Sequence, residues 1–396
     1  MSQSGTATRR LENPRSSGTH TTGILPSQRL RDLIATGKIT SPWPIDEAQI
    51  QPASLDLRLG SIGYRIQASF LPGKGYTVAD KIGDLCMQEI DLSRPCLLER
   101  GCVYLVPVME ELALPSEVRA RANPKSTTGR LDVFTRLICD SGVEFERVPV
   151  GYKGKLYVEI VPRTFSVFIR QGTRLNQLRF IRGSPAAPDS ILDELHAAET
   201  LVYSASGEAA DINVANGLWV SVDLKGTAQE PIIAYRARRN APVVDLSKIA
   251  FYNPLEFWEP IRGPRAQGLI LNPDDFYILG SKELLRVPPK FAAEMVPFDP
   301  SVGEYRVHYA GFFDPGFGYG QGEVKGTRAV LEVRSHEVPF LLEDGQRVGR
   351  LQYERLLDVP SKMYGSGIGS AYQSQGLALS KQFATLPFPT GLSERF

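Results

Sequence analysis

A short loop and a nearby strand carry the side chains best suited to chemistry. The loop KSTTGR, residues 125–130, combines hydroxyl groups with two cations. In the strand-like KLYVEI, alternation puts Glu159 on the face opposite the apolar side chains. A carboxylate beside hydroxyls and cations can exchange protons with a bound molecule. The loop therefore favours a functional Glu159, against the alternative of a solvated strand glutamate.

The strand that holds Glu159 recurs later in the chain. Laid without a gap over residues 155–180, residues 328–353 pair Glu159 with Glu332, an offset of 173 (332 − 159). A single offset that holds over about 80 residues predicts a duplicated domain rather than a solenoid. We expect four parts along the chain: a disordered tail at 1–22, a first copy at 23–184, a second copy at 185–360 and a C-terminal tail at 361–396.

The two copies differ in the loop that corresponds to residues 125–130. Opposite Ser126 and Arg130, the second copy has Asp299 and Gly303 and therefore offers no cation at that place. We expect the first copy to hold the chemistry and Glu332 to be structural.

The fold class follows from short alternating segments separated by turn residues. The chain has 36 Gly and 29 Pro, and runs such as CVYLVPV and LWVSVDL alternate apolar and polar positions, which predicts a mainly β protein. Helices are expected at 27–37, behind a Ser27 cap, and at 188–201.

Composition excludes several classes. A net charge of +1 argues against a large basic surface for nucleic acid, and no apolar run approaches the ~20 residues of a membrane span. The four cysteines form no CxxC pair, so reduced thiols in a cytoplasmic protein are expected. The N-terminal segment has no apolar core of a secretory signal.

In combination, these motifs resemble the dCTP deaminases of the dUTPase-like superfamily. The matching pieces are IQPASLDLRLG (50–60), KSTTGR (125–130), GYKGKLYVEI (151–160), QGTRLNQLRF (171–180) and the tail PSKMYGSGIGSAYQSQGLALSK (360–381). The resemblance implies two tandem distorted jelly-roll β-barrels with short helices. It implies hydrolytic deamination of dCTP to dUTP and ammonia, which feeds dUMP and dTTP synthesis.

The resemblance also assigns site residues. Glu159 would be the general base, with Ser126 holding the water or the amine and Arg130 stabilising developing charge. Further substrate contacts are implied for Lys125, Thr127, Thr128, Tyr157, Val158, Asp314, Tyr364, Tyr372 and Gln375. The sequence departs from the family in two motifs: Asp-Pro-Gly occurs only in the second copy, at 314–316, and the tail lysine is replaced by Ala371.

No resident metal is expected. The chain has four histidines and lacks the H-x-E and P-C-x-x-C signature of zinc deaminases, so a zinc route is disfavoured. Mg²⁺ is expected to arrive with the substrate triphosphate.

Two other functions share the sequence features. One is a dUTP pyrophosphatase, or a bifunctional enzyme that also hydrolyses the triphosphate. The other is a non-catalytic nucleotide-binding regulator. A homo-oligomer is expected, with a trimer favoured.

Overall fold

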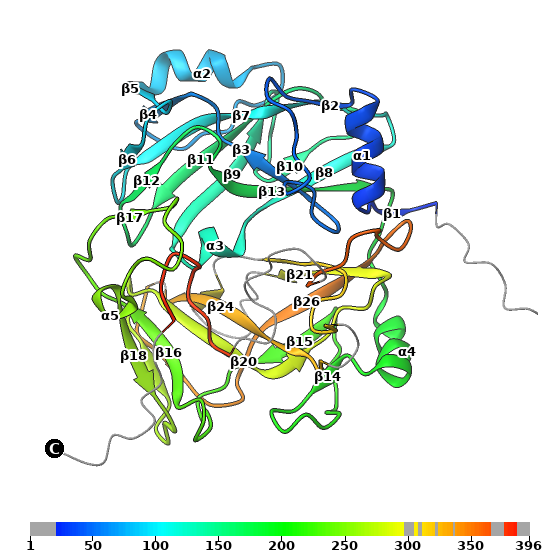
Figure 1. Ribbon diagram of the computed structural model, residues 1–396, viewed down its shortest axis with the longest axis vertical. Helices are drawn as coiled ribbons and strands as arrows, with labels where there is room; N and C mark the ends of the chain where they lie inside the picture. Colours follow the sequence, from blue (N-terminus) through cyan, green and yellow to red (C-terminus); the bar gives the residue numbers. More distant parts are fainter. Residues whose placement is uncertain are drawn as a thin grey trace, which may run out of the picture.

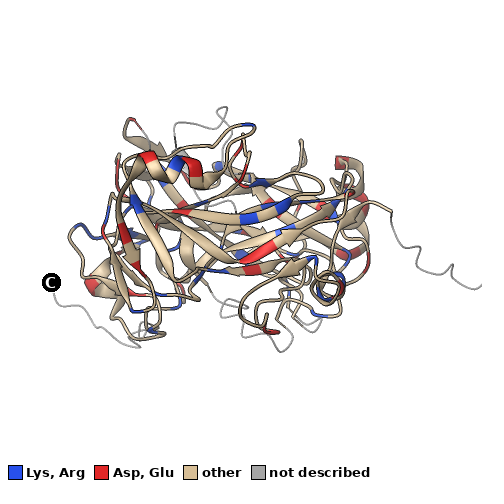
Figure 2. Cartoon of the chain, turned by 90° about the horizontal axis from the view of Figure 1, so that it is seen from above, with Lys and Arg blue, Asp and Glu red and all other residues tan. Residues whose placement is uncertain are grey.

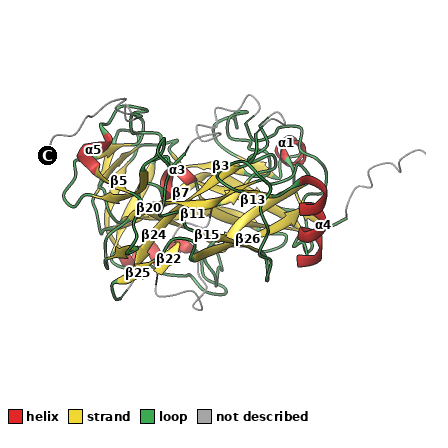
Figure 3. Cartoon of the chain, turned by 90° about the horizontal axis from the view of Figure 1, so that it is seen from below, coloured by secondary structure: helices red, strands yellow, loops and turns green. Residues whose placement is uncertain are grey.

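The computed structural model describes residues 21–296, 305–307, 311–320, 324–335, 337–365 and 376–385. Strands dominate this part of the chain, and the helices are short and lie mostly at its margins (Figure 3). The predicted mainly β class is confirmed. Basic and acidic segments are interspersed along the chain (Figure 2), in line with its near-zero net charge. None of the described helices is long and apolar enough to cross a membrane.

Both helices that the sequence predicts are present. The five described helices are α1 (Ser27–Ala35), α2 (Val78–Leu85), α3 (Ser126–Gly129), α4 (Asp189–Glu199) and α5 (Pro254–Phe257). The expected Ser27 cap is wrong, because Ser27 is the first helical residue and Pro26 holds the cap position. In α2, Thr77 and Asp80 form a reciprocal capping box that the sequence analysis missed.

The first copy contains two larger sheets and contributes to a small third one. The first comprises β1 (Gly23–Ile24), β3 (Leu55–Arg58), β8 (Val118–Pro124), β10 (Arg147–Val148) and β13 (Arg174–Arg182). The second comprises β2 (Ile39–Thr40), β4 (Ile62–Ile66), β5 (Cys86–Asp91), β7 (Val103–Ala113), β9 (Val133–Cys139) and β11 (Lys153–Pro162). The third comprises β6 (Cys96–Leu98), β12 (Val167–Ile169) and β17 (Val244–Asp245).

The second copy repeats the two larger sheets. One comprises β14 (Val202–Tyr203), β16 (Ile232–Ala237), β18 (Trp258–Arg262), β20 (Tyr277–Leu285), β22 (Tyr305–Val307) and β24 (Thr327–Ser335). The other comprises β15 (Leu218–Ser221), β21 (Phe291–Val296), β23 (Phe312–Phe313) and β26 (Arg347–Arg355). A two-stranded sheet joins β19 (Leu269–Leu271) to β25 (Phe340–Leu342).

The strand pairing of the two copies is equivalent, as the sequence repeat predicts. Glu159 of β11 lies opposite Leu105 of β7, and Glu332 of β24 lies opposite Ile278 of β20. Both members of the second pair follow the first by 173 residues (332 − 159 and 278 − 105). The antiparallel pairs β13·β8 and β26·β21 match at the same offset. The chain thus contains a duplicated domain, while the closed jelly-roll form of each copy stays a prediction.

Upstream, the two copies match at a shorter offset. In the first copy, the carboxylate of Glu110 on β7 accepts a hydrogen bond from the backbone N–H of Arg58. In the second copy, the carboxylate of Glu283 on β20 accepts the equivalent bond from the backbone N–H of Ser221. Those carboxylates, Glu110 and Glu283, are themselves 173 residues apart (283 − 110), whereas Arg58 and Ser221 are 163 apart (221 − 58). The sequences SLDLRLG (54–60) and SVDLKG (221–226) look alike at an offset of 167 (221 − 54), which differs from the structural offset by four residues (167 − 163).

The two copies pack against each other directly. Copy one lies above copy two in Figure 1, with α3 between them. One apolar core spans the junction: the ring of Phe165 meets the rings of Phe257 and Trp258 at 5.7 and 5.5 Å between centroids. Strand β17 of the second copy also pairs in parallel with β12 of the first. The site between the copies therefore rests on a continuous packed interior.

Equivalent faces of the two copies have different neighbours. Ile278 in copy two belongs to the core shared with copy one. Its counterpart Leu105 instead packs with Val78 of α2, a helix at the outer edge of the molecule (Figure 1). The face that meets another copy in one half is thus capped by the chain's own helix in the other.

Candidate active site

Helix α3 presents the loop residues at the junction between the copies. Strand β8 ends at Pro124, and the Lys125 backbone N–H then donates to the Leu175 carbonyl at 2.8 Å. The Thr128 hydroxyl donates to the same carbonyl at 2.9 Å. These two bonds anchor both ends of the turn on β13, so that Ser126 is held toward the second copy.

The carboxylate that faces this loop is Glu332. Its Oε1 lies 3.9 Å from Nε of Arg130, and both side chains line a chamber of about 80 Å³ together with Ser126. Arg130 also donates from Nη1 to the Ala378 carbonyl at 3.1 Å, which fixes the guanidinium from the tail side. The expectation that no cation stands near Glu332 is wrong, because Arg130 of the first copy supplies one.

Burial dominates the electrostatics of Glu332. The residue is 5% exposed, and the loss of solvent raises the pKa of its carboxyl to about 8, although Arg130 pulls in the opposite direction. A carboxyl with a pKa in this range can exchange a proton near neutral pH. General acid–base catalysis requires such a group.

Glu159 occupies the same strand position in copy one but a different environment. Its side chain is fully buried, and Oε1 accepts hydrogen bonds from Nε and Nη2 of Arg136 at 3.0 and 2.6 Å. Arg136 is stacked on the ring of Phe145, 3.7 Å from its centroid. Glu159 lines neither the chamber nor the groove beside it. The prediction that it faces Ser126 and Arg130 is wrong, because α2 and Arg136 close that face.

Two neighbours of Glu159 are displaced from the site for the same reason. Tyr157 is packed in the cluster beneath α2, and Val158 lies in the apolar core. Neither lines the chamber or the groove, so neither is placed to contact a molecule in those spaces. Val330, which follows Tyr157 by 173 residues (330 − 157), does line the chamber.

The second copy supplies further residues that the sequence analysis named. Asp314 and Tyr364 both line the chamber. Asp314 is held by Nη2 of Arg179 at 3.5 Å, and burial raises the pKa of its carboxyl. Tyr364 packs on the ring of Phe317 at 5.5 Å between centroids.

Four residues of the sequence-based interpretation cannot be located. The tail residues Tyr372 and Gln375 lie outside the described residues, as do Asp299 and Gly303 of the second-copy loop.

A wider groove of about 900 Å³ adjoins the chamber and shares Lys125, Ser126 and Asp314 with it. Thr127 and Thr128 line this groove, as expected, although the Thr128 hydroxyl is already bonded to the backbone. Five cationic side chains border it: Lys125, Arg170, Arg174, Lys362 and Lys381. This concentration of positive charge suits a polyphosphate chain.

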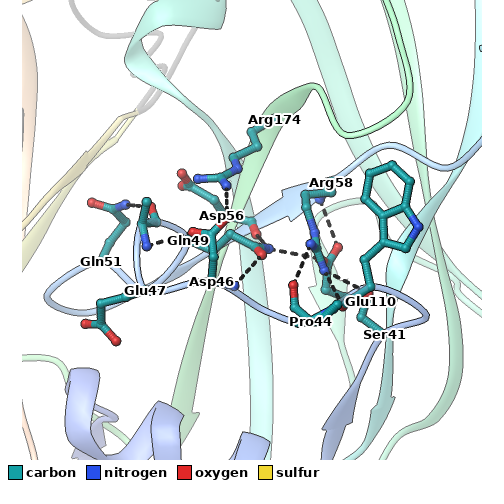
Figure 4. Close-up of polar contacts among 12 residues, drawn as sticks. Ser41, Pro44, Asp46, Glu47, Gln49, Gln51, Asp56, Arg58, Glu110 and Arg174 are labelled. Carbon is teal, nitrogen blue, oxygen red and sulfur yellow. Dashed lines mark hydrogen bonds and ion pairs between the residues drawn. The ribbon is translucent and has the colours of Figure 1, made fainter.

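Carboxylates organise the cations of the groove. Both Asp56 oxygens accept from Nζ of Lys125 at 2.6 Å. Arg174 pairs with Asp46 at 2.7 Å, near Asp56 in Figure 4. Beside them, the buried pair of Arg58 with Glu110 ties β3 to β7 at 2.8 Å (Figure 4).

The described part of the tail closes over the loop. The Ser380 hydroxyl donates to the Thr127 carbonyl at 2.8 Å, and Phe383 is buried against Phe257 with ring centroids 5.2 Å apart. Burial lowers the pKa of Lys381, and Lys125 adds to that effect. In Figure 1 the tail, in red, runs beside α3.

Sequence reasoning missed three groups at this site: Glu332 as the facing carboxylate, Asp56 as the partner of Lys125, and Lys381 at the groove. For Glu332, the sequence does contain a signal that could have identified it. The Asp-Pro-Gly turn and the C-terminal tail both belong to the second half, which indicates that this half contributes one side of the site. Within the described residues, no three His, Cys, Asp or Glu side chains are grouped as a metal site.

Comparisons with known proteins find matches to both halves of the chain. Residues 21–184 match the family model for the dCTP deaminase N-terminal domain, and residues 188–383 match that for the C-terminal domain. A crystal structure of 2′-deoxycytidine 5′-triphosphate deaminase from Agrobacterium tumefaciens is 53% identical and has a TM-score of 0.81. That match covers 85% of this chain and all of the other.

Shorter relatives match part of the chain. A dCTP deaminase from Halorubrum lacusprofundi is 30% identical over 161 residues, which are 40% of this chain and 76% of the relative. A protein from Beutenbergia cavernae named "dCTP deaminase, dUMP-forming" is 29% identical over 41% of this chain and 82% of its own length.

Proposed function

Because the chain belongs to the dCTP deaminase family, we propose that it hydrolyses dCTP to dUTP and ammonia at a site shared between its two copies. The observation that carries the proposal is the buried Glu332 carboxyl facing Ser126 and Arg130 across the junction. Copy one supplies the hydroxyl and the cation, and copy two supplies the base.

The shapes of the chamber and groove suggest how dCTP would lie. The chamber of about 80 Å³ suits the reacting edge of a pyrimidine, and the adjoining groove, with its cations, suits the sugar and triphosphate. Lys125 lies where the two spaces meet and would contact phosphate as a point charge.

Ionised Glu332 would take a proton from water as the water oxygen adds to C4 of the ring. The proton would pass to ring N3, and a second proton, from the added hydroxyl, would go through Glu332 to the departing amine. The C4–N4 bond then breaks, leaving a carbonyl and ammonia. Ser126 would hold the water or the amine by a hydrogen bond, and Arg130 would stabilise the developing negative charge.

No step in this route uses a protein-bound metal. Mg²⁺ would enter with the triphosphate, held by phosphate oxygens and water. The carboxylates that line the groove are consistent with Mg²⁺ being held by the substrate, because they already pair with cations of the protein. Asp56 is paired with Lys125 and Asp314 with Arg179, so both are committed to cations.

The test compares the two equivalent glutamates. Glu332→Gln removes the proton acceptor with little change in shape, and ammonia release from dCTP should fall by roughly 10²–10⁴-fold. Glu159→Gln is the matched control, because it makes the same change at the same strand position outside the site, and it should stay within a few-fold of wild type if the variant folds. A Glu332→Gln variant that keeps a tenth of wild-type turnover would contradict the proposal.

A second candidate is a bifunctional enzyme that also releases pyrophosphate. It is favoured by the relatives whose names include "dUMP-forming". Wild-type protein with dCTP should give equal amounts of ammonia and dUTP under the first proposal, and dUMP with pyrophosphate under the second. A non-catalytic regulator would bind dCTP and release neither product.

A further inference from the structure

A second cationic cavity lies at the junction of the copies, apart from the chamber and the groove. It has a volume of about 280 Å³ and is lined by five arginines: Arg100, Arg163, Arg238, Arg239 and Arg334. None of its lining residues borders the chamber or the groove. We call it the arginine pocket.

Both copies build the arginine pocket. Arg100 lies in the turn between β6 and β7, and Arg163 directly follows β11, so these two come from copy one. Arg238 and Arg239 directly follow β16, and Arg334 is on β24, so the other three come from copy two. The ends of central strands thus bring the guanidinium groups together.

Positive charge in the pocket exceeds its local compensation. Arg239 pairs with Asp275 at 3.1 Å, and Arg334 pairs with Asp132. Across the part of the chain that the structure describes, Arg100, Arg163 and Arg238 have no carboxylate within ion-pair distance. Among the described residues, the carboxylates of Asp274, Asp275 and Asp132 stand against the five guanidinium groups, an excess of two positive charges (five minus three).

This chemistry selects a phosphate-bearing anion. Guanidinium groups bind phosphate through paired N–H donors, and several of them suit a chain of phosphates better than a single one. The volume of about 280 Å³ is close to the lower bound of ~300 Å³ for ordinary ligand pockets, so a di- or triphosphate group fits better than a whole nucleotide. Phe276 is the one aromatic residue of the lining and is itself 1% exposed, so it offers no platform for a base.

The pocket is connected to the catalytic pair by neighbouring residues. Arg334 follows Glu332 by two positions on β24, and Asp132 follows Arg130 by two positions after α3. Arg334 donates to both Asp132 and Thr164, and the Thr164 hydroxyl donates to Asp132 at 2.6 Å. An anion that draws Arg334 toward the pocket would therefore loosen Asp132, next to Arg130.

We propose that the arginine pocket binds the di- or triphosphate group of a ligand other than the substrate in the groove. We further propose that its occupancy changes the turnover of dCTP through Arg334 and Asp132. The binding claim stands on the pocket alone, and the effect on turnover rests on the proposed function.

The binding test uses inorganic tripolyphosphate and full-length protein in isothermal titration calorimetry. Wild type should bind two tripolyphosphates per chain, one in the groove and one in the pocket. Arg100→Gln/Arg163→Gln should lose one of them or bind it at least tenfold more weakly. Arg94→Gln/Lys153→Gln removes two exposed cations elsewhere and should keep both. Unchanged stoichiometry and affinity in the pocket variant, with the fold intact by circular dichroism, would overturn the site.

Two further arms define the ligand and the effect. Orthophosphate should bind the pocket at least tenfold more weakly than tripolyphosphate, and equal affinity would overturn the polyphosphate assignment. At saturating dCTP, tripolyphosphate should change kcat of wild type at least twofold but not kcat of the pocket variant, since competition in the groove alters KM only. An unchanged kcat in wild type would overturn the coupling.

The two proposals can fail separately. Binding of tripolyphosphate without any ammonia release from dCTP would refute the proposed function and leave the pocket supported.

Discussion

Two glutamates in one register show that a strand position does not by itself define the surroundings of a side chain. Glu159 and Glu332 lie on equivalent strands, β11 and β24, each opposite an aliphatic residue of the neighbouring central strand. Glu159 is bonded twice to Arg136, whereas Glu332 has Arg130 at 3.9 Å and a chamber in front of it. At Glu332, burial raises the pKa of the carboxyl to about 8, which leaves its proton exchangeable near neutral pH.

The pH dependence of the proposed reaction follows from Glu332. Its carboxyl, with a pKa of about 8, must be ionised to accept a proton from water. We expect kcat/KM for dCTP to rise with pH and to level off above about 8. A pH profile of ammonia release measures this, and activity that falls between pH 6 and about 8 would contradict the assigned role.

The same shift has a consequence for folding. A carboxyl whose pKa is raised on folding stabilises the native state below its ordinary value of 4.5, and that contribution is lost as pH rises through about 8. The free energy of unfolding of Glu332→Gln should therefore fall less between pH 6 and about 9 than that of wild type.

At the scale of elements, the site depends on two short segments that regular patterns do not reveal. Helix α3 has only four residues and is fixed by bonds to Leu175. The tail is held by the ring cluster around Phe383 and by the bond of Ser380 to Thr127. Both segments are positioned by tertiary contacts.

Loss of the tail anchor should weaken substrate binding. Phe383 is 6% exposed, and truncation of a buried phenylalanine typically lowers stability by about 3–5 kcal/mol. Here the lost contacts are those that hold the tail, so the tail should detach. Phe383→Ala should raise KM for dCTP roughly tenfold, or ~1.4 kcal/mol. Phe251→Ala is the control, since Phe251 is 61% exposed, and it should leave KM within about twofold of wild type. Equal KM values in steady-state kinetics would show that the tail does not close the groove.

The sequence predicted the repeated strands, the β class and the loop at 125–130, because alternation and a fixed offset are local or one-dimensional signals. It placed the wrong glutamate beside Ser126, because the neighbour of Ser126 depends on which faces of the two copies meet. Helix α2 decides that outcome by covering the Leu105 face, and its eight residues carry no sign of their target in the sequence. The shorter offset of the upstream strands was likewise hidden in the sequence, and the hydrogen bonds of Glu110 and Glu283 reveal it.

At the scale of the molecule, buried charge joins the two halves. Arg179 of copy one is fully buried and lies 3.5 Å from Asp314 and 3.6 Å from Glu354 of copy two. Its guanidinium also stacks on the ring of Phe312, 3.9 Å from the centroid. Removing one partner of such a group leaves a charge without compensation, so the copies are mutually dependent in register and spacing.

A junction site inside one polypeptide has a genetic consequence. Where a site forms between separate subunits, two inactive alleles with damage on opposite sides can restore activity when they are mixed. Here Ser126 and Glu332 are encoded in the same chain and meet within it. Co-expression of Ser126→Ala and Glu332→Gln chains should therefore show no intragenic complementation, with ammonia release no higher than the sum of the two alone. Recovery toward a quarter of wild-type activity would mean that halves are exchanged between chains.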